Sequence, residues 1–370
     1  NTIKNADKYG IKVDKISVDF PANIKRSRDV SNRLSKGIEF LMKKNKITHI
    51  YGMGKLTSKT TIETNSSKKK EKVNAKKIII ATGARPKSFP GMEIDGKRVI
   101  SSKEAMMLNT PPKKMIIIGS GAIGSEFAYY YNEFGTEVHL VEMMDRILPV
   151  EDEDISKEVA SNLKKSGIKI SLGTKVSQIE SLKTKVKVHT EKDDKKEILE
   201  GDLALLAVGV TGNIEKIGLE NLGITTANGA IKINEFNQTN IQNIYAIGDV
   251  SGPPWLAHLA SAQGHVAADH AAGHETKPVD YSNIPSCTYC QPQVGSLGMT
   301  ETQAKEKGHD VKVGKFSFQA SGKAMAVGNT TGFVKLVFDG KYGDLLGAHI
   351  VGSEATELIA ELGVAKALET

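Results

Sequence analysis

The amino-acid sequence predicts an α/β protein made of more than one domain, and three observations support this prediction. Its 370 residues exceed what one ordinary hydrophobic core organises. The apolar runs Met115–Ile118 and Asp202–Val210 are typical of strands buried in a parallel sheet. A glycine-rich turn and a helical pattern follow the first run, so the chain contains the start of a strand–helix–strand unit.

The turn after this first strand, residues 119–124, has the pattern Gly-x-Gly-x-x-Gly. Gly119 permits the sharp turn, Gly121 lets a pyrophosphate approach the backbone, and Gly124 lets the helix pack closely on the strand. We therefore expect phosphate groups at the helix N-terminus. A glycine-rich turn in an unrelated sheet is the alternative, and the flanking strands argue against it.

The next strand, Val138–Val141, ends at Glu142, about twenty residues beyond the glycines. A carboxylate at this place accepts hydrogen bonds from the ribose hydroxyls of NAD and repels the 2′-phosphate of NADP. The sequence therefore predicts that NAD, and not NADP, binds at the end of this strand.

The composition, with 39% hydrophobic and 25% charged residues, indicates a soluble globular protein. No apolar run is long enough to cross a bilayer and no signal peptide is recognisable, so we expect a cytoplasmic enzyme, or one of an organelle matrix or stroma. The net charge of +7 comes from scattered lysines, and we expect the basic run Ser66–Lys72 to be a solvated hairpin and not a nucleic-acid site. Two cysteines cannot build a disulfide framework.

The N-terminal part begins with a predicted helix over residues 21–45, where apolar side chains recur at helical spacing. Short strands are expected at Thr48–Tyr51 and Thr60–Glu63. Lys76–Thr82 is a predicted buried strand that runs into Gly83. Free backbone N–H groups at such a strand end favour a cofactor there.

After Glu142 the pattern predicts a helix at Asp152–Lys165 and then a β-meander before the strand that ends at Gly209. The meander strands are expected at Ile168–Leu172, Val176–Ser181 and Val186–Thr190.

The apolar strand Asn243–Val250 contains Asp249, whose carboxylate is placed to bind a sugar-like chain of hydroxyls. A simple turn-forming Gly-Asp pair is an equally good interpretation of this stretch. The helix expected at Leu256–Ala272 is rich in small residues and can pack close to a flat partner. Four histidines lie on it or just beyond it, and we expect no metal because no carboxylate or cysteine completes a ligand set: His258, His265, His270 and His274.

The C-terminal part changes to short strands and a final helix that begins at about Ser353. Cys287 and Cys290 have the spacing of a redox pair, which requires a helix N-terminus, and Pro292 argues against a helix there. We therefore expect two semi-buried thiols in a strand and its turn. The C-terminal strands are predicted at Lys312–Phe318, Gly332–Phe338 and Leu345–Val351.

Seven segments together resemble the flavoprotein disulfide reductases, in the order in which that family has them. They are residues 81–86 (ATGARP), 119–142, the strand ending at Gly209, 243–250 (NIYAIGDV), 255–258 (WLAH), 294–301 (VGSLGMTE) and 345–359 (LLGAHIVGSEATELI). The resemblance implies two Rossmann-like domains, which bind FAD and NAD, and an α+β dimerisation domain. The FAD-binding domain would comprise residues 1–108 and 236–281, the NAD-binding domain residues 109–235, and the dimerisation domain residues 282–370.

The same resemblance implies which residues contact each cofactor. FAD would be contacted by Gly54, Thr82, Gly83, Asp249, Trp255, Leu256, Ala257 and His258. NAD would be contacted by Gly119, Ser120, Gly121, Ala122, Ile123, Gly124, Glu126, Glu142, Val176 and Gly209. In the family, the acid at the position of Glu126 stands near the nicotinamide and pairs with a lysine of the N-terminal region. The helix that begins near Leu256 would direct its positive end at the flavin.

The implied activity is the NAD-dependent oxidation of protein-bound dihydrolipoamide through FAD and a redox disulfide. The implied partners are a second copy of the chain and the lipoyl-bearing acyltransferase of 2-oxo acid dehydrogenase complexes. The family's redox cysteine pair and its C-terminal histidine and glutamate are expected outside these 370 residues, so we do not expect the chain alone to turn over the substrate. The alternatives are a relative of the mercuric reductase or NADH oxidase type, or a non-catalytic nucleotide-binding homologue.

Overall fold

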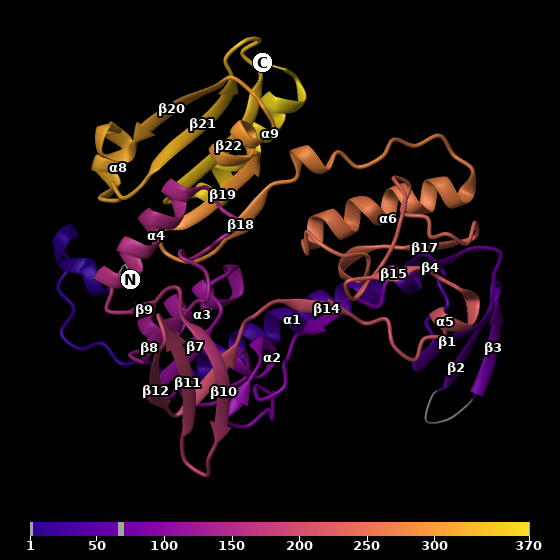
Figure 1. Cartoon of the computed structure of the whole chain (residues 1–370), viewed down its shortest axis with the longest axis horizontal. Coiled ribbons are helices and arrows are strands. Elements are labelled where there is room, and N and C mark those ends of the chain that lie inside the picture. The colour runs from indigo at the N-terminus through magenta and orange to yellow at the C-terminus, as the bar shows by residue number, and fades with distance from the viewer. Residues whose placement is uncertain (1–2, 66–69, 370) are drawn as a thin grey trace. The chain divides into compact units, whose positions relative to one another are not determined.

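The computed structural model describes residues 3–65 and 70–369, whose contacts divide the chain into two compact units (Figure 1). The segments predicted to bind NAD and to form the dimer fall mostly in unit 1, and most of the predicted FAD-binding segments fall in unit 2. The borders of the cofactor domains stay a prediction. Unit 1 comprises Asn1–Ser31, Ser88–Gly209 and Pro285–Thr370, and unit 2 comprises Asn32–Lys87 and Val210–Ile284.

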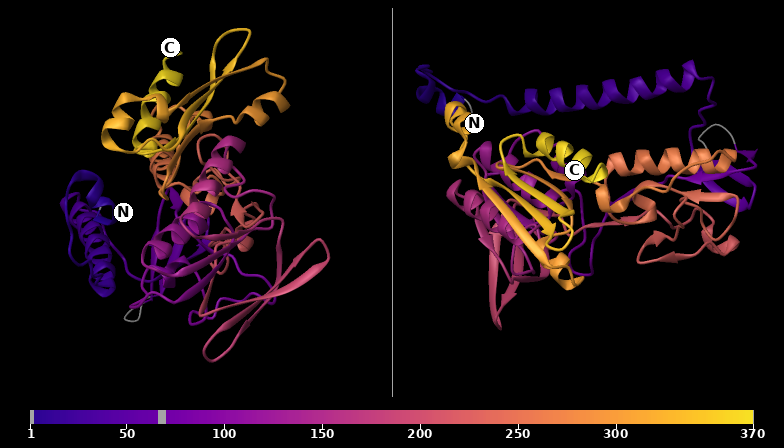
Figure 2. Two further views of the ribbon diagram at one scale, coloured as in Figure 1. Left: turned by 90° about the vertical axis from the view of Figure 1, so that its left-hand side faces the viewer. Right: turned by 90° about the horizontal axis from the view of Figure 1, so that it is seen from above.

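The predicted N-terminal helix is confirmed as α1 (Phe20–Lys44), which follows the short helix η1 (Ile3–Tyr9); Figure 2 shows α1 as a long, straight helix. Its first turns are anchored by Phe20 and Ile24, which are buried. The Phe20 ring packs edge-on against Phe134 with 5.0 Å between the ring centroids. The apolar positions farther along the helix are exposed: Val30, Leu34, Ile38, Phe40 and Leu41.

A five-stranded parallel sheet forms the centre of unit 1, in the order β6-β13-β7-β8-β9. The buried strands predicted from apolar runs are confirmed as its central strands. The placement of Ile168–Leu172 in the meander is wrong, because β9 pairs with β8 in the parallel sheet. The elements are β6 (Val99–Ile100), α2 (Ser102–Ala105), β7 (Lys114–Ile118), α3 (Ala122–Glu133), β8 (Glu137–Val141), α4 (Glu153–Lys165), β9 (Lys169–Ser171) and β13 (Leu203–Leu206).

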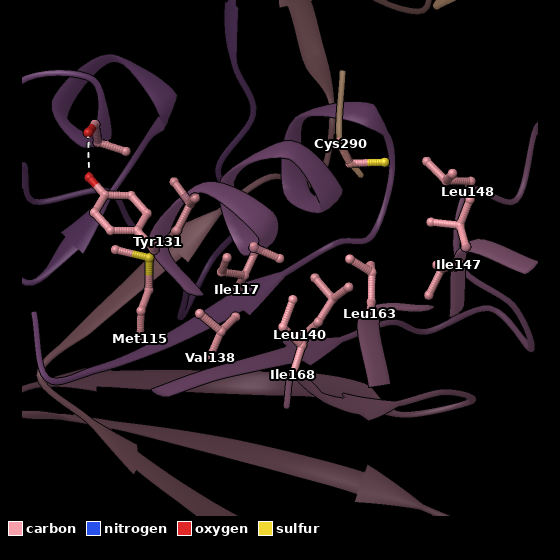
Figure 3. Close-up of a cluster of buried hydrophobic side chains, with 14 of the residues drawn as sticks. Met115, Ile117, Tyr131, Val138, Leu140, Ile147, Leu148, Leu163, Ile168 and Cys290 are labelled. Carbon is pink, nitrogen blue, oxygen red and sulfur yellow. Dashed lines mark hydrogen bonds between the residues drawn. The ribbon is translucent and has the colours of Figure 1, made fainter. Parts of the chain in front are cut away.

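The core of this sheet continues into the C-terminal part of the chain. Figure 3 shows Met115, Val138 and Leu140 from the strands together with Tyr131, whose hydroxyl donates to the Ala105 carbonyl oxygen at 2.5 Å. The same cluster of buried side chains also contains C-terminal residues: Cys290, Val294, Phe333 and Val351. The C-terminal sheet therefore shares one apolar interior with the parallel sheet.

A three-stranded antiparallel meander and a five-stranded antiparallel sheet complete unit 1. The meander has the order β10-β11-β12, with β10 (Lys175–Ser181), β11 (Val186–Lys192) and β12 (Lys195–Gly201). The C-terminal sheet has the order β18-β19-β22-β21-β20, and α9 (Ala355–Ala367) packs against β19 and β22 (Figure 2). Its elements are β18 (Ser286–Thr288), β19 (Gln293–Gly298), α7 (Glu301–Glu306), β20 (Val311–Ser317), η4 (Phe318–Ala320), α8 (Gly322–Val327), β21 (Phe333–Asp339) and β22 (Leu345–Gly352).

Unit 2 contains a parallel pair of strands, β4 and β17, and the helix α6 predicted from the small-residue segment. The strand expected at Thr48–Tyr51 is wrong, because β1 begins at Met53, where it pairs with β2. The described part of the basic run, residues 70–72, lies on β3, which pairs with β2 in an antiparallel way, and residues 66–69 of the run lie outside the described residues. The elements are β1 (Met53–Ser58), β2 (Thr61–Asn65), β3 (Lys70–Asn74), β4 (Ile78–Ile80), β5 (Ala84–Pro86), β14 (Val210–Gly212), α5 (Leu219–Leu222), β15 (Thr226–Ala227), β16 (Ala230–Ile231), β17 (Ile244–Ala246), η2 (Gly248–Ser251), α6 (Ala257–Ala272) and η3 (Tyr281–Asn283).

Among the helices of residues 3–65 and 70–369, none combines the length and the apolar surface that crossing a bilayer requires.

A buried lysine joins the N-terminus of α4 to the C-terminal sheet. The Lys335 side chain on β21 is 3% exposed and its Nζ lies 2.8 Å from Asp152 and 2.8 Å from Glu301. Asp154 lies 3.1 Å away. Burial by itself lowers the pKa of Lys335, but the hydrogen bonds to these carboxylates outweigh it and raise the pKa above its usual value. Lys335 therefore stays charged inside unit 1.

The neighbouring carboxyl group of Glu151 is 5% exposed. Within the described residues it has no ion pair like that of Lys335 to offset the cost of burial. Burial raises its pKa from 4.5 to about 6, although the hydrogen bond with Ser296 opposes this rise. Because the folded state holds this proton more tightly than the unfolded state, stability is lost as the pH rises from about 4.5 to 6. The loss amounts to about 2 kcal/mol for this shift.

We expect Glu151→Gln, which cannot ionise, to unfold at the same urea concentration as the wild type at pH 4.5 and to be about 2 kcal/mol more stable at pH 7.5. Urea unfolding of both proteins across this pH range measures the difference. A difference that does not change with pH would show that Glu151 titrates normally in the folded protein.

Candidate cofactor sites

The predicted NAD residues lie at one edge of the parallel sheet, where three strands end together. Ile118 at the end of β7 pairs with Val141 of β8 on one side and with Leu206 of β13 on the other. The backbone N–H of Gly119 donates to the Val141 carbonyl oxygen at 2.9 Å. Because the strands are parallel and in register, Gly119 and Glu142 follow neighbouring strand ends at this edge.

The glycines at positions 119 and 124 are required by the geometry of the turn. Gly119 has a φ of +95°, and a Cβ atom there would overlap the Ala207 carbonyl oxygen. A Cβ atom on Gly124 would overlap the Gly119 carbonyl oxygen, so this glycine permits the close contact of α3 with the strand end. A Cβ atom on Gly121 would meet nothing within 4 Å, which leaves space in front of the turn.

The helix that follows the turn offers its N-terminus as an anion site. Gly121 is the N-cap of α3, and no side chain of the described chain caps this end. The N–H groups of the first turn are therefore left for a ligand, and the helix dipole favours a negative one. Ala122 and Ile123 of this turn are exposed, and Ser120 beside it is buried.

The carboxylate of Glu142 is held in one orientation by three donors. Its Oε2 accepts from the Ser120 backbone N–H at 2.8 Å and from the Ser120 hydroxyl at 2.7 Å. Its Oε1 accepts from the Met144 backbone N–H at 2.9 Å. The side chain is 8% exposed, so the carboxylate is a fixed acceptor at the end of β8.

Three further predicted NAD residues have different surroundings. Val176 on β10 is buried in an apolar cluster with Ile118 and Val141, beneath the strand ends. Gly209 beyond β13 has a φ of +97° and open space around its Cα atom. Glu126 on α3 accepts from the Tyr289 backbone N–H at 2.9 Å, and burial raises its pKa.

Glu126 therefore has a partner that no sequence pattern indicates. The family resemblance implied an ion pair with a lysine, and within the described residues Glu126 forms none. Its hydrogen bond joins α3 to the turn after β18. No local sequence pattern connects these positions, which are 163 residues apart.

Three of the predicted FAD residues follow the ends of the parallel pair β4–β17 in unit 2. The Ile247 backbone N–H donates to the Ile80 carbonyl oxygen at 3.0 Å, so the two strand ends are adjacent. Thr82 and Gly83 follow β4, and Asp249 follows β17 in the short helix η2. Both segments are predicted from the sequence as apolar strands that run into a glycine.

A cavity of about 310 Å³ lies beside Asp249 and Trp255. Its wall also includes the backbone of Gly212, Gly229 and Gly252. This volume lies at the lower end of the range for small-molecule sites and holds part of a dinucleotide. The carboxylate can accept from ligand hydroxyl groups, and the aromatic ring can contact a flat ring of the ligand. The glycines let the ligand approach the protein backbone.

The N-terminus of α6 completes this region. The helix begins at Ala257, and its N-cap residue Leu256 provides no side-chain hydrogen bond. Gln263 within α6 accepts from the Gly248 backbone N–H at 2.6 Å and so fixes η2 against the helix. Gln263 was not predicted, because a single glutamine in a helix carries no signal. Among the remaining predicted residues, His258 is exposed on α6, and Gly54 is exposed on β1 with the Ile62 side chain 3.5 Å from its ideal Cβ position.

The histidines and cysteines have structural partners. His270 Nδ1 lies 2.9 Å from the Tyr245 hydroxyl, and His274 Nδ1 lies 3.7 Å from Asp269. In residues 3–65 and 70–369 no three His, Cys, Asp or Glu side chains form a group that could hold a metal ion. Cys287 lies on β18 and Cys290 in the following bend, as predicted, and both are free thiols. The prediction of two semi-buried thiols holds for Cys287, whereas Cys290 is 1% exposed because it belongs to the apolar core of unit 1. Burial raises the pKa of both, that of Cys290 to about 12, so neither is an activated thiolate.

Comparison with known families gives a match over most of the chain. The pyridine nucleotide-disulphide oxidoreductase model matches residues 4–264, and the model of the dimerisation domain of these proteins matches residues 284–370. The dihydrolipoyl dehydrogenase of Rhizobium etli is 46% identical over 372 residues, which cover 96% of this chain and 77% of that protein. The dihydrolipoyl dehydrogenase of Bacillus subtilis is 41% identical over 379 residues, which cover 100% of this chain and 80% of that protein.

Two solved structures have the same fold. LpdA from Mycobacterium tuberculosis superposes with a TM-score of 0.91 at 24% sequence identity, over 99% of this chain and 80% of that one. The HOCl-induced flavoprotein disulfide reductase RclA from Escherichia coli superposes with a TM-score of 0.85 at 27% identity, over 94% of this chain and 80% of that one.

Proposed function

The chain belongs to the pyridine nucleotide-disulphide oxidoreductase family, and from this we propose that it acts as an FAD-containing, NAD-dependent dihydrolipoyl dehydrogenase. The similarity to proteins of that name over nearly the whole chain carries the proposal. The predicted fold class of two nucleotide-binding domains and a dimerisation domain is confirmed by the family match.

The NAD site uses the edge of the parallel sheet. The α3 N-terminus and the glycine turn hold the pyrophosphate, because they offer unpaired N–H groups and a close approach to the backbone. Glu142 accepts from a hydroxyl of the adenosine ribose. Glu126 lies in the same helix, and burial raises its pKa. The family resemblance implies that it would stand near the nicotinamide.

The FAD site uses the strand ends of unit 2. When bound, FAD supplies the two-electron relay between a thiol pair and the nicotinamide. Asp249 accepts hydrogen bonds from the polyol chain of the cofactor, and Thr82 and Gly83 bring backbone close to it. The uncapped N-terminus of α6 stabilises negative charge on the flavin ring through its dipole.

Two partners follow from the family. The chain contains the dimerisation domain of these enzymes, so the protein forms a homodimer through residues 284–370. The further partner is the lipoyl-bearing acyltransferase of a 2-oxo acid dehydrogenase complex, because dihydrolipoamide is presented as a prosthetic group on such a protein.

We expect the full-length gene product to reduce NAD with dihydrolipoamide and to use NADP roughly ten- to a hundredfold less efficiently. The 2′-phosphate of NADP would meet the Glu142 carboxylate in a partly dry site, a like-charge contact that costs about 1–3 kcal/mol. Steady-state assays with both nucleotides give the ratio of kcat/KM. Equal efficiency would contradict the assignment of Glu142. Oxidation of the reduced nucleotide by oxygen or mercuric ion, without turnover of dihydrolipoamide, would identify a different member of the family.

A further inference from the structure

The side chain of Ser120 does not face the phosphate position of the glycine turn. It is fully buried, and its hydroxyl donates to Glu142 Oε2 at 2.7 Å, where the backbone N–H of the same residue also donates, at 2.8 Å. A carboxylate oxygen has about two acceptor positions. Both positions on Oε2 are therefore filled by Ser120 alone.

The other oxygen of Glu142 is only half occupied. Oε1 accepts from the Met144 backbone N–H at 2.9 Å and, within the described residues, from no second donor. The carboxylate also has no lysine or arginine partner among those residues. Its one open acceptor position on Oε1 is the place where a ligand hydroxyl can donate.

We propose that Ser120 is a positioning residue that fixes the Glu142 carboxylate so that Oε1 receives a ribose hydroxyl, and that it thereby contributes to the selection of NAD over NADP. The inference rests on the proposed NAD-dependent function. A hydroxyl donates a proton to Oε1, whereas a phosphate that is ionised near neutral pH has no proton to donate and repels the carboxylate. A carboxylate free to rotate would discriminate less, because it could turn away from the phosphate.

The backbone of Ser120 is held by contacts that do not involve its hydroxyl, so the hydroxyl can be removed without loss of these backbone contacts. The Ser120 carbonyl oxygen accepts from the Leu148 backbone N–H at 2.9 Å and from the Ser125 hydroxyl at 3.0 Å. The residue also precedes the N-cap Gly121, so its side chain does not cap α3. Ser120→Ala removes one oxygen atom and leaves these backbone contacts in place.

Calorimetric titration of the full chain with NADH and with NADPH tests the proposal in a double-mutant cycle of Ser120→Ala and Glu142→Ala. We expect Ser120→Ala to weaken NADH binding about three- to tenfold and to reduce the preference for NADH over NADPH by a similar factor, since one charge-assisted hydrogen bond is lost. In the Glu142→Ala background, the same change should alter NADH affinity less than about twofold. Ser156→Ala, which removes another buried serine hydroxyl that donates to the Leu148 carbonyl oxygen, is the matched control and should leave affinity unchanged.

The outcomes separate this inference from the proposed function. A wild-type chain that binds NADH and NADPH equally overturns the NAD assignment itself. A selective wild type with an unchanged Ser120→Ala variant overturns only the role of Ser120. An equal loss in the presence and absence of Glu142 would show that Ser120 acts by a route other than Glu142, which also overturns the proposal.

Discussion

Replacement of Lys335 by methionine is expected to lower the free energy of unfolding of unit 1 by about 3–5 kcal/mol. The Lys335 side chain is 3% exposed, and Asp152, one of its partners, is 2% exposed. Methionine fills a similar volume, but it leaves the buried carboxylate of Asp152 without its cation. Asp154 and Glu301 are 35% and 29% exposed and keep Lys315 and Lys305 as partners, so the cost arises mainly at Asp152. The cost is that of uncompensated buried charge and not of lost packing.

Urea unfolding followed by circular dichroism measures this effect, with Lys315→Met as the matched control. Lys315 also reaches Asp154, at 3.3 Å, but its side chain is 45% exposed, so its loss should cost less than about 1 kcal/mol. If Lys335→Met were as mild as the control, the buried ion cluster would contribute little to stability. At low pH, where the carboxylates are protonated, the two variants should converge.

Gly124→Ala is expected to weaken NADH binding by at least about a hundredfold, although it adds a single methyl group. The Cβ atom would occupy the position of the Gly119 carbonyl oxygen, so α3 must move away from the strand end. Misplacement of a catalytic group by about 1 Å can cost about a hundredfold, and we expect a loss of similar size for the binding of the pyrophosphate here. The pyrophosphate would then lose the N–H groups of the first helical turn.

Fluorescence titration with NADH measures the loss, and Gly37→Ala provides the control. Gly37 lies within α1, and a Cβ atom there would meet nothing within 4 Å, so this change should leave affinity unchanged and favour the helix slightly. Undiminished NADH affinity in Gly124→Ala would mean that the nucleotide does not use the glycine turn.

The sequence predicted the parallel sheet and both strand-end sites because their signals are local. A strand buried on both faces is a continuous apolar run, and Lys114–Ile118 and Leu203–Leu206 have that pattern. The glycine pattern and the distance to Glu142 are set by one short segment, so no long-range information was needed. The family resemblance then added the FAD residues, whose individual signals are weak.

Strand pairings and contacts between residues far apart in the sequence could not be predicted in the same way. The strand at Lys169–Ser171 was predicted from its local pattern. Whether it joins the meander or the parallel sheet depends on its pairing with β8, which precedes it in the chain and is separated from it by helix α4. The contact of Glu126 with the Tyr289 backbone also depends on tertiary packing. Lys335 is an intermediate case, because strict alternation along β21 places it on the inner face, where a lysine signals a buried counter-charge.

The shared apolar interior of unit 1 has a consequence for the order in which the protein is synthesised. All residues of unit 2 have been synthesised once residue 284 is added to the chain. Unit 1 cannot close its core at that stage, because Val294, Phe333 and Val351 have yet to be made. One apolar face of the parallel sheet therefore stays uncovered until the last strands have been translated. A chaperone that shields nascent apolar surface would act on this face during that interval.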